Sequence, residues 1–201
     1  MIDTTLNNRL DNDGAIYIKD VLNKDICILL SHCLLRNSFY EDKKTGDFQV
    51  PNAAAIMDHE ILFETIHEKI WAALEAMLKI ELLPTYSYAR LYKNENTLEK
   101  HTDRPSCEIS LTVQLARSHH YSWPIYMGDK RFDLAEGDGV IYKGCDIEHW
   151  REKCNGPKDY LSGQAFFHFV KANGDFVDHA NDKRQLKNLY IRNRNLIFES
   201  K

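Results

Sequence analysis

The chain has 201 residues, 43% of them hydrophobic, and a formal net charge of −4. These values fit one domain with its own core, and the net charge disfavours a nucleic-acid-binding surface. The five cysteines are odd in number and form no CxxC pair, which argues against a disulfide framework or a zinc knuckle.

Both predicted helices lie in the first half of the chain. Residues 15–18 have the pattern of a short strand. Asn23 is a candidate N-cap for a helix that runs to about Leu35, whose apolar residues recur at three- and four-residue steps. The following residues, 37–52, are polar and irregular, and we expect a mobile loop there that could cover a site.

A longer helix is predicted over residues 59–80, and Pro84 prevents its continuation. His59 and His67 lie on or near this helix, and we expect them to face solvent or to cap it, because neither belongs to a spaced cluster. The apolar stripe of the helix consists of Phe63, Ile66, Ile70, Leu74, Met77 and Leu78.

From Thr85 onward the pattern is that of β-structure. Strands are predicted at 86–92, 108–115, 121–127, 131–134, 140–143, 149–153 and 161–170. Their spacing favours a sandwich or barrel, and the preceding helices are expected to support one sheet face. The tail, 175–201, is rich in Lys, Arg and Asn, with a weak amphipathic element at Leu186, Leu189, Tyr190 and Ile197.

The segment His101-Thr102-Asp103, together with the distant His149, indicates a metal site. Residues i and i+2 of a strand point to the same side, so His101 and Asp103 can bind one ion while His149 arrives from another strand. Two imidazoles and one carboxylate form the facial set that non-heme Fe(II) oxygenases use. The competing interpretation is a surface HxD segment to which His149 is unrelated.

Several segments resemble one known family. They are DGAIYIKDVL, YARLYKNENTLEKHTD and FDLAEGDGVIYKGCDIEHW, with HTDRPSCEISLTVQL, HWRE and QAFFHFV. Over roughly residues 13–171 the chain resembles the Fe(II)/2-oxoglutarate-dependent dioxygenases. Within them it is similar to the compact prolyl-4-hydroxylase-like branch, and to a bacterial and phage subgroup of that branch.

This resemblance implies a mainly-β fold with N-terminal helices, a double-stranded β-helix (jelly roll) buttressed by α-helices. It implies a single domain over residues 1–201, with a core at about 13–171 and a C-terminal extension at about 172–201. The ligands of Fe(II) would be His101, Asp103 and His149. 2-Oxoglutarate would be the cosubstrate, O2 the oxidant and ascorbate a candidate reductant.

The family places a basic residue against the distal carboxylate of 2-oxoglutarate. Lys158 is nine positions after His149, where the family usually has it, but it lies in an Asn-Gly-Pro-Lys-Asp turn. Arg151 is two positions after His149 and would face the same side of a strand, with a planar fork that suits a carboxylate. We favour Arg151, and Arg104 is a third candidate whose alternative role is a salt bridge to Asp103 or Glu108.

Three further residues are candidates for cosubstrate contacts. Tyr92 matches a strand tyrosine that in this branch donates its hydroxyl to the cosubstrate, although a core tyrosine fits equally well. Thr112 and Gln114 belong, with Ser110, to the polar register of a strand that is apolar on its other side. That register either lines a pocket or forms a solvent face.

The activity implied is hydroxylation of an unactivated C–H bond of an amino acid, a peptidyl residue or a small metabolite, with release of succinate and CO2. Nucleic acid is disfavoured as a partner by the net charge. No apolar run has the length of a membrane span and the N-terminus is polar, so a cytoplasmic protein is expected. The alternatives are a cupin-like metalloenzyme that does not use 2-oxoglutarate and a non-catalytic jelly-roll binding module.

Overall fold

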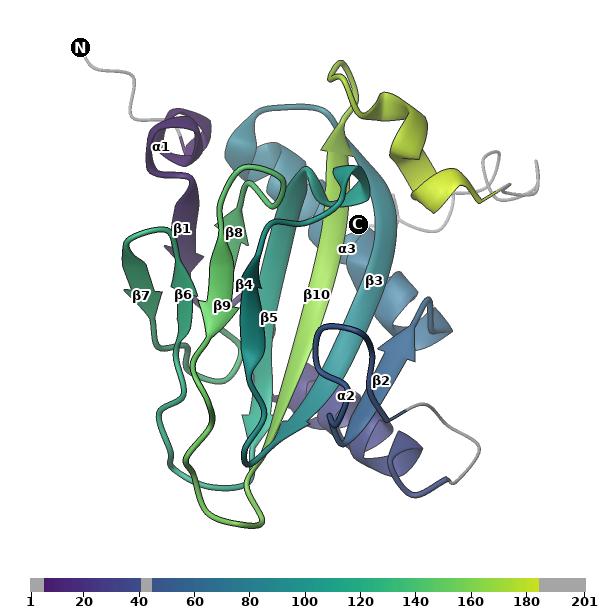
Figure 1. Cartoon of the computed structure of the whole chain (residues 1–201). Coiled ribbons are helices and arrows are strands. Elements are labelled where there is room, and N and C mark those ends of the chain that lie inside the picture. The colour runs from purple at the N-terminus through teal and green to yellow at the C-terminus, as the bar shows by residue number, and fades with distance from the viewer. Residues whose placement is uncertain (1–5, 41–44, 185–201) are drawn as a thin grey trace.

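The computed structural model describes residues 6–40 and 45–184. Two antiparallel sheets face each other, and α2 and α3 cover the outer face of the larger one (Figure 1). The helices are α1 (Leu6–Asp13), α2 (Lys24–Asn37) and α3 (Ile61–Leu78), with 3-10 segments η1 (Pro105–Cys107) and η2 (Val177–Lys183). The strands are β1 (Ala15–Ile18), β2 (Ala55–Asp58), β3 (Leu82–Lys93), β4 (Leu98–His101), β5 (Ile109–Arg117), β6 (Ile125–Met127), β7 (Lys130–Phe132), β8 (Gly139–Tyr142), β9 (His149–Arg151) and β10 (Leu161–Lys171).

The strand order confirms the predicted jelly roll. The larger sheet runs β1-β8-β5-β10-β3-β2 and the smaller one β4-β9-β6-β7. Every pair is antiparallel, and most neighbours are distant in the sequence, as the β5–β10 and β4–β9 pairs illustrate. Such crossovers close two sheets around one interior.

The predicted N-terminal elements are largely confirmed, and the missed ones are short. Asn23 caps α2, since its side chain accepts a hydrogen bond from the backbone N–H of Ile26 at 3.0 Å. Two short elements, α1 and β2, were not predicted. The sequence of α1 is polar and buries only Leu10, while β2 is a four-residue strand that pairs with β3 alone. Neither segment carries a long periodic apolar pattern.

The buried face of α3 differs in two places from its predicted stripe. Met77 is exposed, and Trp71 occupies the core instead. His67 was expected to face solvent or to cap the helix, but this is wrong: the ring lies against Phe167 and Phe169 of β10, with centroids at 5.7 and 4.5 Å. Its position is helically in phase with the apolar stripe, so packing buries it. Burial lowers the pKa of His67 to about 3, and the ring stays neutral.

Alternation along β5 separates two environments. Its apolar residues pack with α2 and α3, at Ile109, Leu111, Val113 and Leu115. Ser110, Thr112 and Gln114, between them, are also buried. A solvent face is therefore excluded for this register, which points into the space between the sheets.

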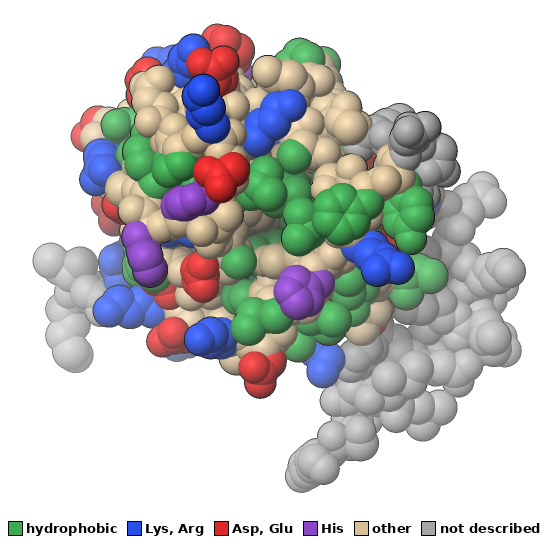
Figure 2. All heavy atoms as spheres, turned by 90° about the horizontal axis from the view of Figure 1, so that it is seen from below, with side chains coloured by type: hydrophobic (Ala, Val, Ile, Leu, Met, Phe, Trp, Pro, Cys, Tyr) green, Lys and Arg blue, Asp and Glu red, His purple; other side chains and the backbone are tan. Residues whose placement is uncertain are grey.

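The described part of the C-terminal extension packs on the jelly roll. Arg184 pairs with Glu64 of α3 at 3.1 Å and donates to the backbone carbonyl of Thr85 at 2.9 Å. The amphipathic element predicted around Leu186 to Ile197 lies outside the described residues. Seen from below, the surface mixes hydrophobic side chains with charges of both signs (Figure 2). In the described ranges, no helix combines the length and hydropathy that a membrane span requires.

Candidate functional site

The structure brings together the three side chains that the spacing singled out. His101 ends β4 and His149 begins β9, and the two are partners in the β4–β9 register. Asp103 follows two residues after His101, and its Oδ1 lies 3.7 Å from His101 Nε2 and 3.5 Å from His149 Nε2. One donor atom from each residue lies within 4.8 Å of the others. The competing interpretation, in which His149 is unrelated to the HxD segment, is therefore wrong.

Both imidazoles are oriented by backbone carbonyls. His101 Nδ1 lies 2.7 Å from the carbonyl oxygen of Glu99, and His149 Nδ1 lies 3.0 Å from that of Ile147. A proton on each Nδ1 makes these contacts hydrogen bonds and leaves the Nε2 lone pairs directed at Asp103. Burial and the neighbouring His149 lower the pKa of His101, which favours the neutral, metal-binding form.

The carboxylate of Asp103 is held on its other side by two hydroxyl groups. Tyr142 Oη lies 3.3 Å and Ser110 Oγ 3.5 Å from Asp103 Oδ2. Burial alone would raise the pKa of Asp103. In the metal-free protein a proton on His149 Nε2, which a bound metal ion would replace, bonds to the carboxylate and lowers the pKa. The backbone N–H of Asp103 donates to the carbonyl of Gly144 at 2.8 Å. The carboxylate is therefore fixed as an anion with Oδ1 toward the imidazoles.

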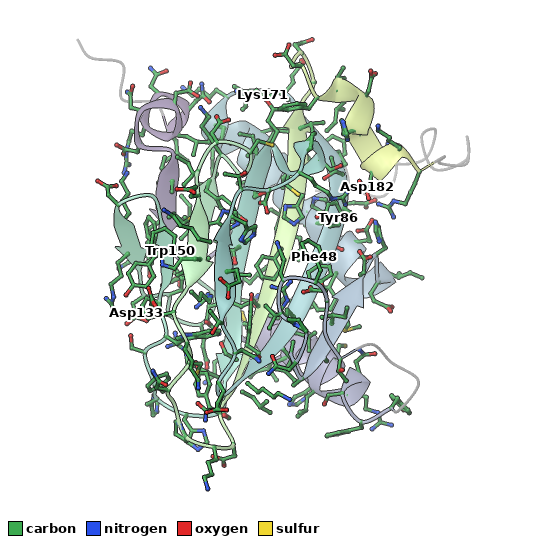
Figure 3. All side chains as sticks on the ribbon, in the orientation of Figure 1. Phe48, Tyr86, Asp133, Trp150, Lys171 and Asp182 are labelled. Atoms are coloured by element: carbon green, nitrogen blue, oxygen red, sulfur yellow. The ribbon has the colours of Figure 1, made fainter. Side chains whose placement is uncertain are left out.

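The triad lies in a cavity of about 480 Å³ between the sheets. Aromatic side chains form much of its wall, namely Phe48, Tyr86, Tyr88, Tyr142 and Phe166. Phe48 is 92% exposed, and Figure 3 shows it on the loop in front of β3, with Tyr86 nearer Asp182. Part of the expected loop at 37–52 thus contributes to the cavity, while residues 41–44 lie outside the described part.

Arg90 is a cavity residue that the sequence did not single out. Its guanidinium is buried, forms an ion pair with Asp47 and donates to Gln49 Oε1 at 2.9 Å and to Tyr92 Oη at 2.7 Å. Asp47 also accepts from the hydroxyl of Tyr88. The alternation along β3 could have predicted this position, because Arg90 lies in the same two-residue register as the tyrosines that face the interior.

Arg151, the favoured cosubstrate residue, is fully buried but does not line this cavity. It donates to the backbone carbonyl of Trp123 and lies over the rings of Trp123 and Tyr92, at 4.8 and 5.8 Å. Among the described residues no carboxylate is within ion-pairing distance of it. Burial lowers its pKa. A buried cation without a carboxylate partner is costly, and an incoming anion would lower that cost.

Of the other two basic candidates, Lys158 lies outside the cavity and Arg104 lies at its wall. Lys158 is exposed in the turn before β10. Arg104 was the third candidate for the cosubstrate carboxylate, with a salt bridge to Asp103 or Glu108 as its alternative role. The structure shows neither salt bridge: the guanidinium binds Asp182 of η2 at 2.8 and 3.0 Å and covers the ring of Tyr86 at 4.5 Å. The chain turns after Asp103 so that Arg104 faces the C-terminal segment.

The three remaining candidates are buried and hydrogen-bonded within the barrel. Tyr92 accepts from Arg90 and packs edge-on against Trp123. Gln114 donates to Ser162 Oγ at 3.1 Å, and the hydroxyl of Thr112 donates to Gln164 Oε1 at 3.3 Å. None of the three lines the cavity.

Comparison with protein-family models gives no match, and comparison with curated protein sequences gives none either. Solved structures do match. A prolyl-4-hydroxylase from Pseudomonas putida is 15% identical, with a TM-score of 0.58 over 80% of this chain and 95% of that one. The viral collagen prolyl hydroxylase of Paramecium Bursaria Chlorella virus-1 is 11% identical, with a TM-score of 0.57 over 79% and 98%. The fold is that of the 2-oxoglutarate–Fe(II) oxygenases.

A third match shows that this fold does not set the reaction. SnoN, a non-heme α-ketoglutarate-dependent epimerase from nogalamycin biosynthesis, is 13% identical, with a TM-score of 0.63 over 90% of this chain and 88% of that one. An epimerase and prolyl hydroxylases therefore share the architecture described here. The oxygenase fold predicted from the sequence is confirmed, and the reaction has to be argued from the site.

Proposed function

We propose that the protein is an Fe(II)- and 2-oxoglutarate-dependent dioxygenase that hydroxylates an unactivated C–H bond of an amino acid, a peptidyl residue or a small metabolite. The observation that carries the proposal is the convergence of two imidazole Nε2 atoms and one carboxylate oxygen on a cavity wall. This donor set suits iron and leaves coordination positions on the cavity side for the cosubstrate and O2.

The donor set fits the metal on chemical grounds. Both histidines can be neutral at Nε2, and Asp103 is ionised. When bound, Fe(II) with 2-oxoglutarate and O2 supplies the oxidising power, with release of succinate and CO2. Tyr142 and Ser110 hold Asp103 Oδ2, so that Oδ1 stays directed at the metal position. The aromatic wall limits water and leaves room for a substrate beside the metal.

Arg151 is the proposed partner of the distal carboxylate of 2-oxoglutarate. It lies two residues after His149 on β9, a displacement of roughly 6–7 Å along a strand. That displacement suits a five-carbon diacid with its other end at the metal. Arg90, the second buried arginine of the barrel, already has Asp47 as its carboxylate partner, so Arg151 is the cation that gains most from an incoming anion.

The activity is tested by succinate formation from 2-oxoglutarate. Turnover should require Fe(II) and O2 and should disappear in His149→Ala, whose folding is checked by circular dichroism. Metal binding without succinate formation would favour a cupin-like enzyme that does not use 2-oxoglutarate, and absence of metal binding would favour a binding module.

The substrate is sought by mass spectrometry against amino acids and lysate peptides. Hydroxylation adds one oxygen atom to the product. Because SnoN is an epimerase of the same fold, the screen should also separate stereoisomers of unchanged mass. Succinate formed with a mass-neutral product would support the cofactor assignment and contradict hydroxylation.

The cosubstrate residue is tested separately. Arg151→Met should raise the 2-oxoglutarate concentration needed for half-maximal turnover far more than Lys158→Met, since Lys158 is exposed in its turn. The reverse order would contradict the role given to Arg151.

A further inference from the structure

A second set of potential metal ligands adjoins the first. One donor atom each from Asp103, Cys107 and His168 lies within 4.8 Å of the others. Cys107 comes from η1 and His168 from β10, and both are buried and line the same cavity as the triad. Neither residue has a role in the proposed reaction.

Neighbouring hydroxyl groups contact both side chains. His168 Nδ1 lies 2.8 Å from Ser110 Oγ, which orients the ring, and the ring packs against Tyr86 with centroids 4.6 Å apart. Cys107 Sγ lies 3.3 Å from the hydroxyl of Tyr86. A metal-binding histidine usually has its other ring nitrogen held in this way, and a coordinating thiol gives up its proton.

We propose that Asp103, Cys107 and His168 form a second site, specific for soft or borderline divalent cations such as Zn²⁺ and Cd²⁺, whose occupation excludes iron from the first. Thiolate, imidazole and carboxylate together are a zinc donor set, whereas the first set contains no sulfur. On binding, the thiol proton passes to solvent and no redox change takes place. Asp103 belongs to both sets, and two divalent cations held by its one carboxylate repel each other, so an ion in the second set disfavours iron in the first.

The test uses Cd²⁺ added to metal-free protein, read by the thiolate-to-cadmium charge-transfer absorption and by sulfur scattering in X-ray absorption. Wild type should show both signals at one cadmium per chain, and so should His101→Ala, which retains the second set. Cys107→Ser should lose both signals. Cys145→Ser is the matched control, because Cys145 is a free thiol near Arg104 that is not in the set, and it should keep them.

Competition is measured on the same variants. Zn²⁺ should displace Fe²⁺ from wild type, and about tenfold more Zn²⁺ should be required in Cys107→Ser. A cadmium–sulfur signal that persists in Cys107→Ser, or that vanishes in Cys145→Ser, would overturn the site. Iron and cadmium bound together would overturn the exclusion.

Thermal unfolding shows whether each variant is folded, and Cys107→Ala and His168→Gln serve as second substitutions. The cadmium–sulfur signal does not depend on turnover. The signal would therefore remain if no succinate were formed, so the second metal site and the oxygenase activity can be refuted independently of each other.

Discussion

Gly144→Ala is the substitution that most directly tests how Asp103 is positioned. A Cβ at position 144 would lie 2.7 Å from Asp103 Oδ2 and 3.0 Å from Ser110 Oγ, and it would overlap the backbone carbonyl of Cys107. The backbone cannot easily retreat, because Gly144 donates to the carbonyl of Glu108 and accepts from the N–H of Asp103. The methyl group must therefore displace the carboxylate or separate the chain segments that hold it.

The expected magnitude follows from these contacts. Forcing a methyl group into a packed site costs about 1–3 kcal/mol of folding stability. Loss of a group that orients a metal ligand typically weakens metal binding about 10–100-fold, or roughly 1.4–2.7 kcal/mol. The loss of stability and the loss of metal affinity should appear together, because the same Cβ would contact both the backbone and the carboxylate of Asp103.

Calorimetric titration of the metal-free protein with Mn²⁺, a redox-stable substitute for iron, measures the affinity, and urea unfolding measures the stability. Gly163→Ala is the matched control, since the atoms nearest to its Cβ would belong to Leu115, Leu34 and Ala116 at 3.5–3.7 Å, which are ordinary contact distances. An Mn²⁺ affinity of Gly144→Ala within about twofold of wild type would refute the reasoning.

Three other substitutions test separate parts of the structure. Tyr142→Phe removes the hydroxyl 3.3 Å from Asp103 Oδ2 and should weaken Mn²⁺ binding about tenfold in the same titration; an unchanged affinity would remove Tyr142 from the site. Asp47→Asn leaves Arg90 buried without its carboxylate and should cost roughly 3 kcal/mol in urea unfolding; a loss below about 1 kcal/mol would show that the ion pair is dispensable. Burial holds the pKa of His67 at about 3, below its ordinary 6.5, so the unfolded chain binds a proton that the folded chain does not. Stability should fall as the pH drops from 6.5 toward 3, and His67→Leu should flatten this dependence; superimposable pH profiles would contradict it.

Local patterns made much of the fold and the triad predictable. The alternation along β5 gave its two faces, and the i, i+2 spacing of His101 and Asp103 placed both on one side of the chain. Such patterns depend on backbone geometry within a few residues. The resemblance to the prolyl-4-hydroxylase-like branch supplied the closure of the strands into two sheets, which periodicity alone does not specify.

The features that the sequence did not reveal depend on contacts between distant segments. Arg90 became a cavity residue because Asp47 reaches it from a loop 43 positions away. The guanidinium of Arg104 binds the carboxylate of Asp182, which is 78 positions away, and not that of the adjacent Asp103. In the sequence His67 is an isolated polar residue. Its burial depends on the phenylalanines of β10, which lie about 100 positions away. The charge or polarity of a single residue does not predict which of several possible side-chain partners will lie next to it in the fold.

Crystals of the protein soaked in Mn²⁺ without oxygen would locate the metal directly by anomalous scattering. We expect one strong peak within coordination distance of His101 Nε2, Asp103 Oδ1 and His149 Nε2. A peak at any other position, or none at a concentration that saturates calorimetric binding, would contradict the iron site and with it the proposed oxygenase.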